Sequence, residues 1–553
     1  MNLPGVARVR VRHAIGWQRR RHLAWSRHFL LLAIASACLR DGVAAVPTIP
    51  ASVANVVRQR VDYGYSAGIA VGMVNRDGRA FLGHGRKSLT DGGTIDERTV
   101  FEIGSVTKVF TCSLLAEMIE RGEVELNQSL QSLLPESVTV PRRNGEITLE
   151  HLALHTSGLP TNPDPLCGRA DQPFDCLTEG TVDAFLNRFQ LPREPGAGWE
   201  YSNLGMGLLG RALALRAGTD YQSLLRSRIL EPLGLASTRI DPDSWPTDEV
   251  AMGHSGVLMR PPFRIPVLEG AGALRSTVED LLTFASFNLG LRDTPLSAAL
   301  ASAHRRRAAT TYGGVSIGLG WWLWGLPGGE VIQHGGDTPG FTAFVGIHKG
   351  KGLGVVVLSN ARGNTYSAVI DVGLHLLDSA YPLTSIRRPA SVDAGLLANF
   401  AGIYREPTGD TFELGGVSGR LVAYHPRSNF DMTLYPESTR RFAAIDYELG
   451  PSTSATFRLN AQGRVTGMDW TQNGGTTTYS RHAEPASLGI AVDAGARRIL
   501  LRGGADVSYA VEASTDLRRW VRIGLVKTGD EGLTDPTADS SQNNRYYRAV
   551  RER

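Results

Sequence analysis

The sequence contains few cysteines, little net charge and no apolar stretch that is long enough to span a bilayer. Only 4 of its 553 residues are cysteines, and no cysteine–histidine spacing typical of zinc sites occurs. The net charge of +4 is unevenly spread, because the first 45 residues contain eight arginines and a single acid, Asp41. The remainder is therefore slightly acidic, which argues against nucleic-acid binding. We expect no nucleic-acid partner and no cofactor.

The basic N-terminal segment is typical of a secretory leader. Its arginines precede a short apolar run, residues 29–39, and small residues follow at 43–45. The run is too short for a stable transmembrane helix. We therefore predict a signal peptide over residues 1–45 and an exported protein, periplasmic or secreted. Lipidation at Cys38 and an uncut N-terminal anchor, the only expected membrane contact, are the alternatives.

The remaining cysteines receive separate predictions. Cys167 and Cys176 lie in a loop rich in Pro and Asp, and they can form a disulfide if the protein is exported. Cys112 follows apolar residues at helical spacing, so we expect a small buried side chain.

The order of apolar patterns predicts the domains. Two short strands, 68–74 and 79–83, precede a mostly helical block, and strands return from about residue 313. This order fits an α+β domain over residues 46–385, in which N- and C-terminal strands share one antiparallel sheet. Strand-and-turn patterns then predict all-β modules, a small barrel or sandwich over 394–483 and a further β tail over 485–553.

Ser105 and Lys108 are the first candidate catalytic residues. Ser105 opens a helix with apolar residues at helical spacing, and positions three apart share one helix face. A serine hydroxyl needs a base to become a nucleophile, and a lysine can be that base when burial lowers its pKa. On its own, this tetrapeptide also fits an ordinary helix start with a solvated lysine.

Two further motifs carry suitable chemistry. Tyr201 can exchange a proton with a buried lysine as general acid or base, and the Asn203 amide can bind a substrate carbonyl. The segment His334-Gly-Gly336-Asp337 on a strand suggests close approach of a ligand or another backbone. Alone, either motif is explained by a loop tyrosine or a glycine-rich hairpin.

Together, the three motifs and their surroundings resemble the class C-like branch of the β-lactamase and penicillin-binding serine hydrolases. The similarity spans about residues 50–380 and includes the segments 101–108, 147–160, 270–277, 318–321 and 334–341. It implies the β-lactamase/D,D-peptidase fold, with Ser105 as nucleophile and Lys108 and Tyr201 as proton carriers. Asn203, His334 and Gly336 would bind substrate, and the backbone N–H groups of Ser105 and Asp337 would form the oxyanion hole.

One departure from the family bears on the substrate. His334 stands where class C β-lactamases usually have the lysine of Lys-Thr-Gly, as in certain D,D-peptidases, D-aminopeptidases and esterases. The resemblance therefore implies a peptidase or amidase that acts on D- or non-standard residues. A carboxylesterase, a β-lactamase and a non-hydrolytic penicillin-binding sensor or scaffold are the alternatives. Residues 394–483 resemble lipocalin-like barrels that follow such domains, whereas His151 and His155 are expected to be structural.

Overall fold

The computed structural model describes the chain from Ala45 onward, with short gaps. The described residues are 45–90, 92–166, 168, 172–364, 367–425, 430–444, 453–483, 487–493, 496–502, 508–514, 521–527, 533–534 and 546–551. The predicted leader, residues 1–45, lies almost wholly outside them, as do Cys38 and Cys167. Within the described part of the chain, no helix combines the length and the apolar character needed to cross a membrane.

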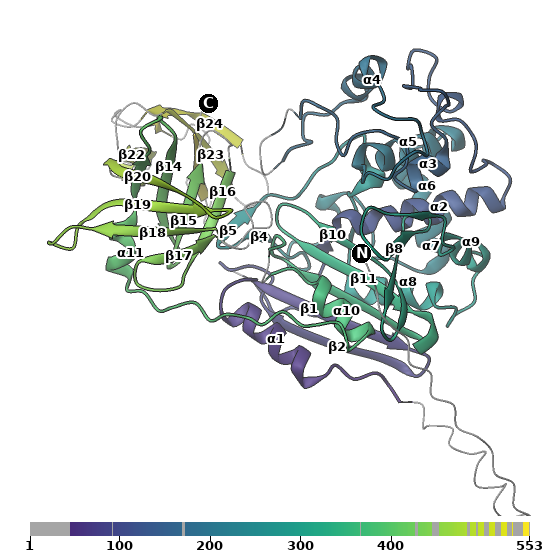
Figure 1. Ribbon diagram of the computed structural model, residues 1–553, viewed down its shortest axis with the longest axis horizontal. Helices are drawn as coiled ribbons and strands as arrows, with labels where there is room; N and C mark the ends of the chain where they lie inside the picture. Colours follow the sequence, from purple (N-terminus) through teal and green to yellow (C-terminus); the bar gives the residue numbers. More distant parts are fainter. Residues whose placement is uncertain are drawn as a thin grey trace, which may run out of the picture. The chain divides into compact units, whose positions relative to one another are not determined.

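An eight-stranded antiparallel sheet forms the centre of the catalytic domain (Figure 1). Its spatial order is β2-β1-β12-β11-β10-β9-β8-β7, so the N-terminal hairpin pairs with strands from much later in the chain. The strands are β1 (Gly68–Asn75), β2 (Gly78–Gly85), β7 (Ala308–Ala309), β8 (Val315–Ile317), β9 (Trp322–Leu326), β10 (Gly329–Asp337), β11 (Thr342–His348) and β12 (Leu353–Ser359). The prediction of one antiparallel sheet from N- and C-terminal strands is confirmed.

Side chains of β1 alternate between two cores, as a sheet covered on both faces requires. Ile69 and Val71 pack in one core with α1 (Ala51–Asp62) and α10 (Ile370–Leu377). Ala70 and Val74 face the opposite side, in the core that includes α8 (Val278–Asn288).

The helical block lies between β2 and β7 in the sequence. Besides α8, its longer helices are α2 (Thr107–Glu120), α4 (Glu179–Arg188), α5 (Asn203–Ala217) and α9 (Ser297–Ala303), and its shorter ones are α3 (Leu149–Ala153), α6 (Tyr221–Leu225) and α7 (Glu231–Leu233). Short strand pairs join β3 (Phe101–Glu102) to β6 (Arg275–Ser276) and β4 (Gly253–Ser255) to β5 (Leu258–Arg260).

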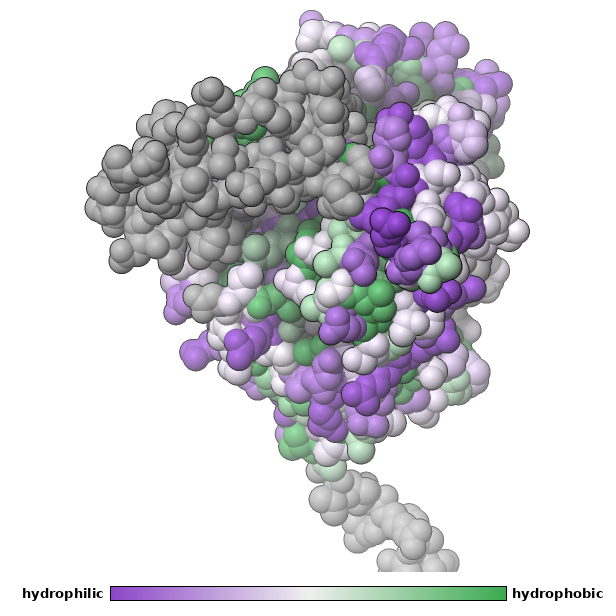
Figure 2. All heavy atoms as spheres, turned by 90° about the vertical axis from the view of Figure 1, so that its left-hand side faces the viewer, coloured by the Kyte–Doolittle hydropathy of each residue, from purple (hydrophilic) through white to green (hydrophobic). Residues whose placement is uncertain are grey.

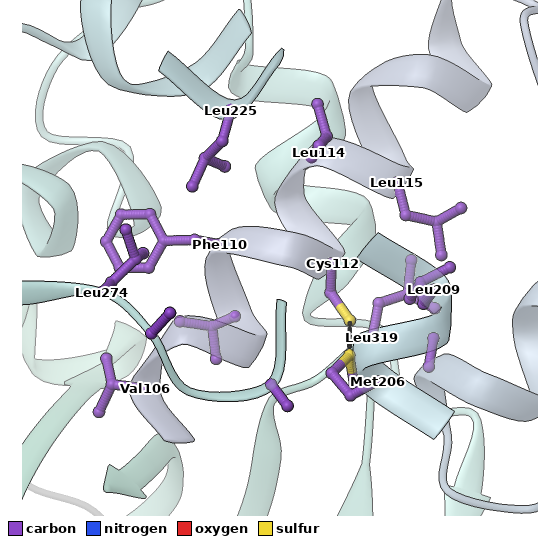
Figure 3. Close-up of a cluster of buried hydrophobic side chains, with 14 of the residues drawn as sticks. Val106, Phe110, Cys112, Leu114, Leu115, Met206, Leu209, Leu225, Leu274 and Leu319 are labelled. Carbon is purple, nitrogen blue, oxygen red and sulfur yellow. Dashed lines mark hydrogen bonds between the residues drawn. The ribbon is translucent and has the colours of Figure 1, made fainter. Parts of the chain in front are cut away.

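Helix α2 runs through the interior of this block and is apolar almost all round, which is typical of a buried helix. Figure 3 shows Phe110, Leu114 and Leu115 pointing from it into leucines of neighbouring segments. The Cys112 thiol is free, buried and 3.8 Å from the sulfur of Met206, which confirms the predicted buried cysteine. The helix that begins beside Ser105 is thus fixed along its length by packing.

The C-terminal part of the chain is all-β. After α11 (Ala394–Phe400), a closed barrel contains β13 (Gly402–Arg405), β14 (Thr411–Val417), β15 (Arg420–His425), β16 (Phe430–Pro436), β17 (Arg441–Ala444), β18 (Ser454–Leu459), β19 (Val465–Gln472) and β20 (Gly475–Ala483). Two three-stranded sheets follow, with β21 (Ser487–Asp493), β22 (Ala496–Arg502), β23 (Ser508–Ser514), β24 (Val521–Lys527), β25 (Leu533–Thr534) and β26 (Tyr546–Arg551). The predicted fold class, α+β followed by all-β modules, is confirmed.

The visible face of the protein carries small hydrophobic patches separated by hydrophilic side chains (Figure 2). This pattern is normal for a folded chain in water.

Candidate active site

Ser105 lies in a short 3-10 helix, Gly104–Val106, directly before α2. Gly104 has a φ of +47°, and a Cβ there would lie 2.7 Å from the carbonyl oxygen of Asp337. A Cβ at Gly336 would lie 2.0 Å from the carbonyl oxygen of Ile103. These two glycines therefore let β10 approach the turn that carries Ser105, which gives Gly336 a packing function beside its predicted place in the substrate site.

Lys108 is fully buried, and its Nζ lies 2.9 Å from Ser105 Oγ, 2.8 Å from Asn203 Oδ1 and 2.6 Å from the carbonyl oxygen of Ala271. The amide and carbonyl oxygens can only accept hydrogen bonds, whereas the serine hydroxyl can also donate one. A neutral amine satisfies all three contacts, with two N–H groups donating and its lone pair directed at the Ser105 hydroxyl.

Burial lowers the pKa of Lys108 from 10.5 to about 7, because the charged ammonium loses its hydration there. The neutral amine is therefore accessible near pH 7. The predicted burial of this lysine is confirmed, and its geometry with Ser105 is that of a base beside its nucleophile.

Tyr201 stands directly before the N-cap of α5, and its phenol is close enough to the Ser105 hydroxyl for that hydroxyl to act on its pKa. The Lys108 Nζ lies 4.8 Å from the centre of its ring. Burial raises the pKa of the Tyr201 phenol, so it stays protonated at neutral pH. Of the two roles left open by the sequence, this environment favours a neutral phenol that passes a proton on.

Asn203 is the first residue of α5, and both ends of its amide are engaged. Its Oδ1 accepts from Lys108, and its Nδ2 donates to Asn162 Oδ1 over 3.0 Å. Asn162 escaped sequence reasoning, because its only signal was its place just after the segment 147–160.

His334 lies on β10 and is buried. Its Nδ1 contacts the carbonyl oxygen of Gly335, which can only accept, so Nδ1 carries the proton. Its Nε2 is buried without a hydrogen-bond partner among the described residues. Burial and the nearby Lys108 lower the pKa of His334 to about 3, so the ring is neutral. The structure thus gives no support to a charged His334 that attracts a substrate carboxylate.

The predicted oxyanion hole consists of the backbone N–H groups of Ser105 and Asp337. The N–H of Thr338 donates to the Phe341 carbonyl across the β10–β11 turn, and Asp337 is paired with Thr342 in the ladder. Because neighbouring N–H groups point to opposite edges of a strand, the N–H of Asp337 points away from β11. A Cβ on Gly104 would lie 2.9 Å from this nitrogen, so Asp337 N lies beside the Ser105 turn.

A buried ion pair supports both sides of this arrangement. Glu102 Oε1 accepts from Arg275 Nη2 over 3.0 Å and from the backbone N–H of Phe263 over 2.7 Å. Its Oε2 accepts from Thr338 Oγ1 over 2.7 Å. Glu102 precedes Ser105 by three residues and Thr338 follows Asp337, so one carboxylate links the two segments.

The family model described as Beta-lactamase matches residues 53–377, more than half of the chain. The chain belongs to the Beta-lactamase family. The resemblance read from the three motifs is thereby confirmed, and the protein is a serine hydrolase of this family.

The known proteins that are similar to this chain are named for different activities. The D-alanyl-D-alanine-carboxypeptidase/endopeptidase AmpH of Escherichia coli (strain K12) is 28% identical over 59% of this chain and 89% of its own. Penicillin-binding protein 4 of Amycolatopsis lactamdurans is 28% identical over 54% of this chain and 81% of its own. A solved structure described as a β-lactamase/D-alanine carboxypeptidase from Pseudomonas syringae covers 60% of this chain and 100% of its own, with TM-score 0.53 and 22% identity.

His151 and His155 are the two histidines that the sequence predicts to be structural. His155 is buried under the Tyr201 ring, with centroids 4.5 Å apart, and its Nδ1 accepts from the backbone N–H of Ser202. His151 caps α3 through a hydrogen bond from Thr148 N. Both contacts are structural ones.

The structure describes only one of the two cysteines in the predicted disulfide. Cys176 is disulfide-bonded, whereas Cys167 lies outside the described residues, so the pairing stays a prediction. Among the described residues, no group of three or more His, Cys, Asp or Glu side chains is placed to hold a metal ion.

Proposed function

We propose that this protein hydrolyses amide bonds of peptides through an acyl-enzyme on Ser105, and that its substrates contain D- or other non-standard residues. The observation that carries the proposal is the contact set of Lys108. Its two obligate acceptors, Asn203 Oδ1 and the Ala271 carbonyl, leave the lone pair of the neutral amine for the Ser105 proton.

The reaction follows from these positions. Ser105 Oγ attacks the substrate carbonyl carbon while its proton passes to Lys108 Nζ. The backbone N–H groups of Ser105 and Asp337 hold the developing oxyanion, and each such donor contributes roughly 3–4 kcal/mol in serine hydrolases. Tyr201 relays the proton to the leaving nitrogen, the C–N bond breaks, and water then releases the acyl group by the reverse route.

Two observations favour a peptide over a β-lactam. The third motif contributes a neutral His334, because burial lowers the pKa of its ring to about 3, so this position supplies no cation for a β-lactam carboxylate, which an internal amide bond of a peptide does not need. The similar AmpH is named as a carboxypeptidase and endopeptidase. A carboxylesterase is the second candidate, because the same acyl-enzyme chemistry cleaves esters.

A substrate panel tests the proposal. We expect a D-Ala-D-Ala peptide or a linear peptide with D-residues to be hydrolysed, and labelled penicillin to acylate the protein slowly. Ser105→Ala should lose turnover and labelling, whereas Ser132→Ala, at an exposed serine, should keep both. Turnover of p-nitrophenyl acetate or butyrate alone would replace the peptidase by an esterase. Efficient nitrocefin hydrolysis would favour a β-lactamase, and activity retained by Ser105→Ala would refute the nucleophile.

We also propose that the protein is exported after cleavage of residues 1–45. The support is the order of residue types in that segment, in which arginines come first, an apolar run follows and small residues come last. N-terminal sequencing of the mature protein tests it, and a start before residue 30 would overturn it. In this proposal, the partner is the peptide substrate and the site needs no cofactor.

A further inference from the structure

Three aromatic side chains meet beside Tyr201. The ring of Trp199 lies 5.5 Å from that of Trp322 and 5.8 Å from that of Tyr312, both edge-to-face. Tyr312 and Trp322 are 5.5 Å apart. We call Trp199, Tyr312 and Trp322 the aromatic wall.

The aromatic wall comes from three segments that the fold brings together. Trp199 precedes Tyr201 by two residues, and Trp322 begins β9, where it pairs with Gln333. Tyr312 stands in the turn between β7 and β8. These positions place the wall beside the second and third motifs at once.

The aromatic wall leads from the reacting groups to solvent. Trp322 contacts the ring of Tyr201 at 6.3 Å and that of His334 at 6.2 Å. At the other end, Tyr312 is 56% exposed, and it is close enough to influence the Tyr201 phenol electrostatically. A partly exposed group of three aromatic rings that adjoins a nucleophile is suited to an apolar part of the substrate.

The contacts of the aromatic wall also indicate which part of a substrate would lie against it. In the proposed reaction, Tyr201 delivers the proton to the leaving group, so the leaving group must lie next to its hydroxyl. The wall packs on Tyr201, whereas the amides of Asn162 and Asn203 are engaged with each other and with Lys108. An apolar side chain on the leaving group therefore falls against the wall.

We propose that the aromatic wall is a binding subsite for an aromatic or large apolar side chain on the leaving group. For a peptide, this is the residue released with a free amine after cleavage. The inference rests on the proposed function and narrows it: the released residue is large and apolar instead of alanine.

Paired substrates test the subsite in the full chain. N-acetyl-D-Ala-D-Phe and N-acetyl-D-Ala-D-Ala share their acyl group, and so do benzyl and methyl butyrate, whose alcohols have similar acidity. We expect the wild type to prefer the aromatic member about tenfold or more in kcat/KM. Tyr312→Ala should lower that ratio about tenfold, and Tyr312→Phe, which keeps the ring, should preserve it.

Leu215→Ala is the matched control, because Leu215 is 44% exposed near the far end of α5, about 18 Å along the helix from Asn203. In Leu215→Ala, the ratio of kcat/KM between the aromatic and the small substrate of each pair should equal that of the wild type. A wild type without preference, or equal losses on both members in Tyr312→Ala, would overturn the subsite.

A binding measurement separates this inference from the proposed function. If neither peptide nor ester is cleaved, the proposed function fails, and calorimetry with D-phenylalanine and D-alanine decides the subsite. Tighter binding of D-phenylalanine that Tyr312→Ala weakens would support the aromatic wall, and equal binding of the two would refute it.

Discussion

Replacing Glu102 with alanine is expected to destabilise the catalytic domain strongly. The carboxylate is 6% exposed and the Arg275 guanidinium 4%, so removal leaves a buried charge without its partner. The Thr338 hydroxyl and the Phe263 N–H lose their acceptor in the same step. Breaking a buried pair from one side costs about 3–5 kcal/mol, out of a typical total of about 5–15 kcal/mol.

The assay is thermal unfolding, followed by tryptophan fluorescence and checked by penicillin labelling at each temperature. At about 2–4 °C per kcal/mol, the catalytic domain should unfold roughly 10 °C earlier. Glu231→Ala is the control, because its pair with Arg226 spans 3.6 Å with side chains 65% and 66% exposed, and such pairs contribute less than about 1 kcal/mol. A Glu102→Ala midpoint within 2 °C of the Glu231→Ala midpoint, roughly 1 kcal/mol at most, would refute the reasoning.

Three further predictions concern the site itself. Because only neutral Lys108 accepts the serine proton, kcat/KM should rise with pH through about 7 and then level off; a profile flat from pH 5 to 9 would contradict this. Lys108→Met should abolish turnover yet gain stability over the wild type. The pKa of Lys108 is lower in the folded protein than in the unfolded chain, so the wild type becomes more stable as the pH rises from about 7 to 10.5. The denaturant midpoints of the wild type and of Lys108→Met should therefore converge over that window. Gly336→Ala should give a lower yield of soluble protein that penicillin labels, because its Cβ would lie 2.0 Å from the Ile103 carbonyl oxygen. Gly415→Ala, where the added Cβ meets open space, should keep the wild-type yield. Equal yields of the two variants would count against the close approach at Gly336.

The α+β class followed from the order of strand and helix patterns in the sequence, and helical spacing set Ser105 and Lys108 on one helix face. That Tyr201 joins them in one site was implied by the resemblance to a known family. Helical spacing also set Cys112 in the core. The structure adds the direction of each hydrogen bond at Lys108, which no spacing encodes.

Other parts of the site depend on contacts between distant segments. Asn162 meets Asn203, and Glu102 meets Thr338, which follows it by 236 residues in the sequence, so neither contact has a local pattern. Tyr312 stands in a turn, and nothing in its sequence neighbourhood indicates that it meets Trp199 and Trp322. The neutral state of His334 follows from its burial and from the nearby Lys108, which comes from a distant part of the sequence, because the same residue on an exposed strand would titrate near pH 6.5.

The pairing of β1 with β12 has a consequence for how the chain reaches its native state. Ile69 is paired with Ser359, so the central strands of the sheet cannot form until nearly the whole catalytic domain has been synthesised. Such non-local pairing closes a long loop before it gains any contact, which slows folding. Until then, β1 keeps one unpaired edge, which can pair with a strand of another chain.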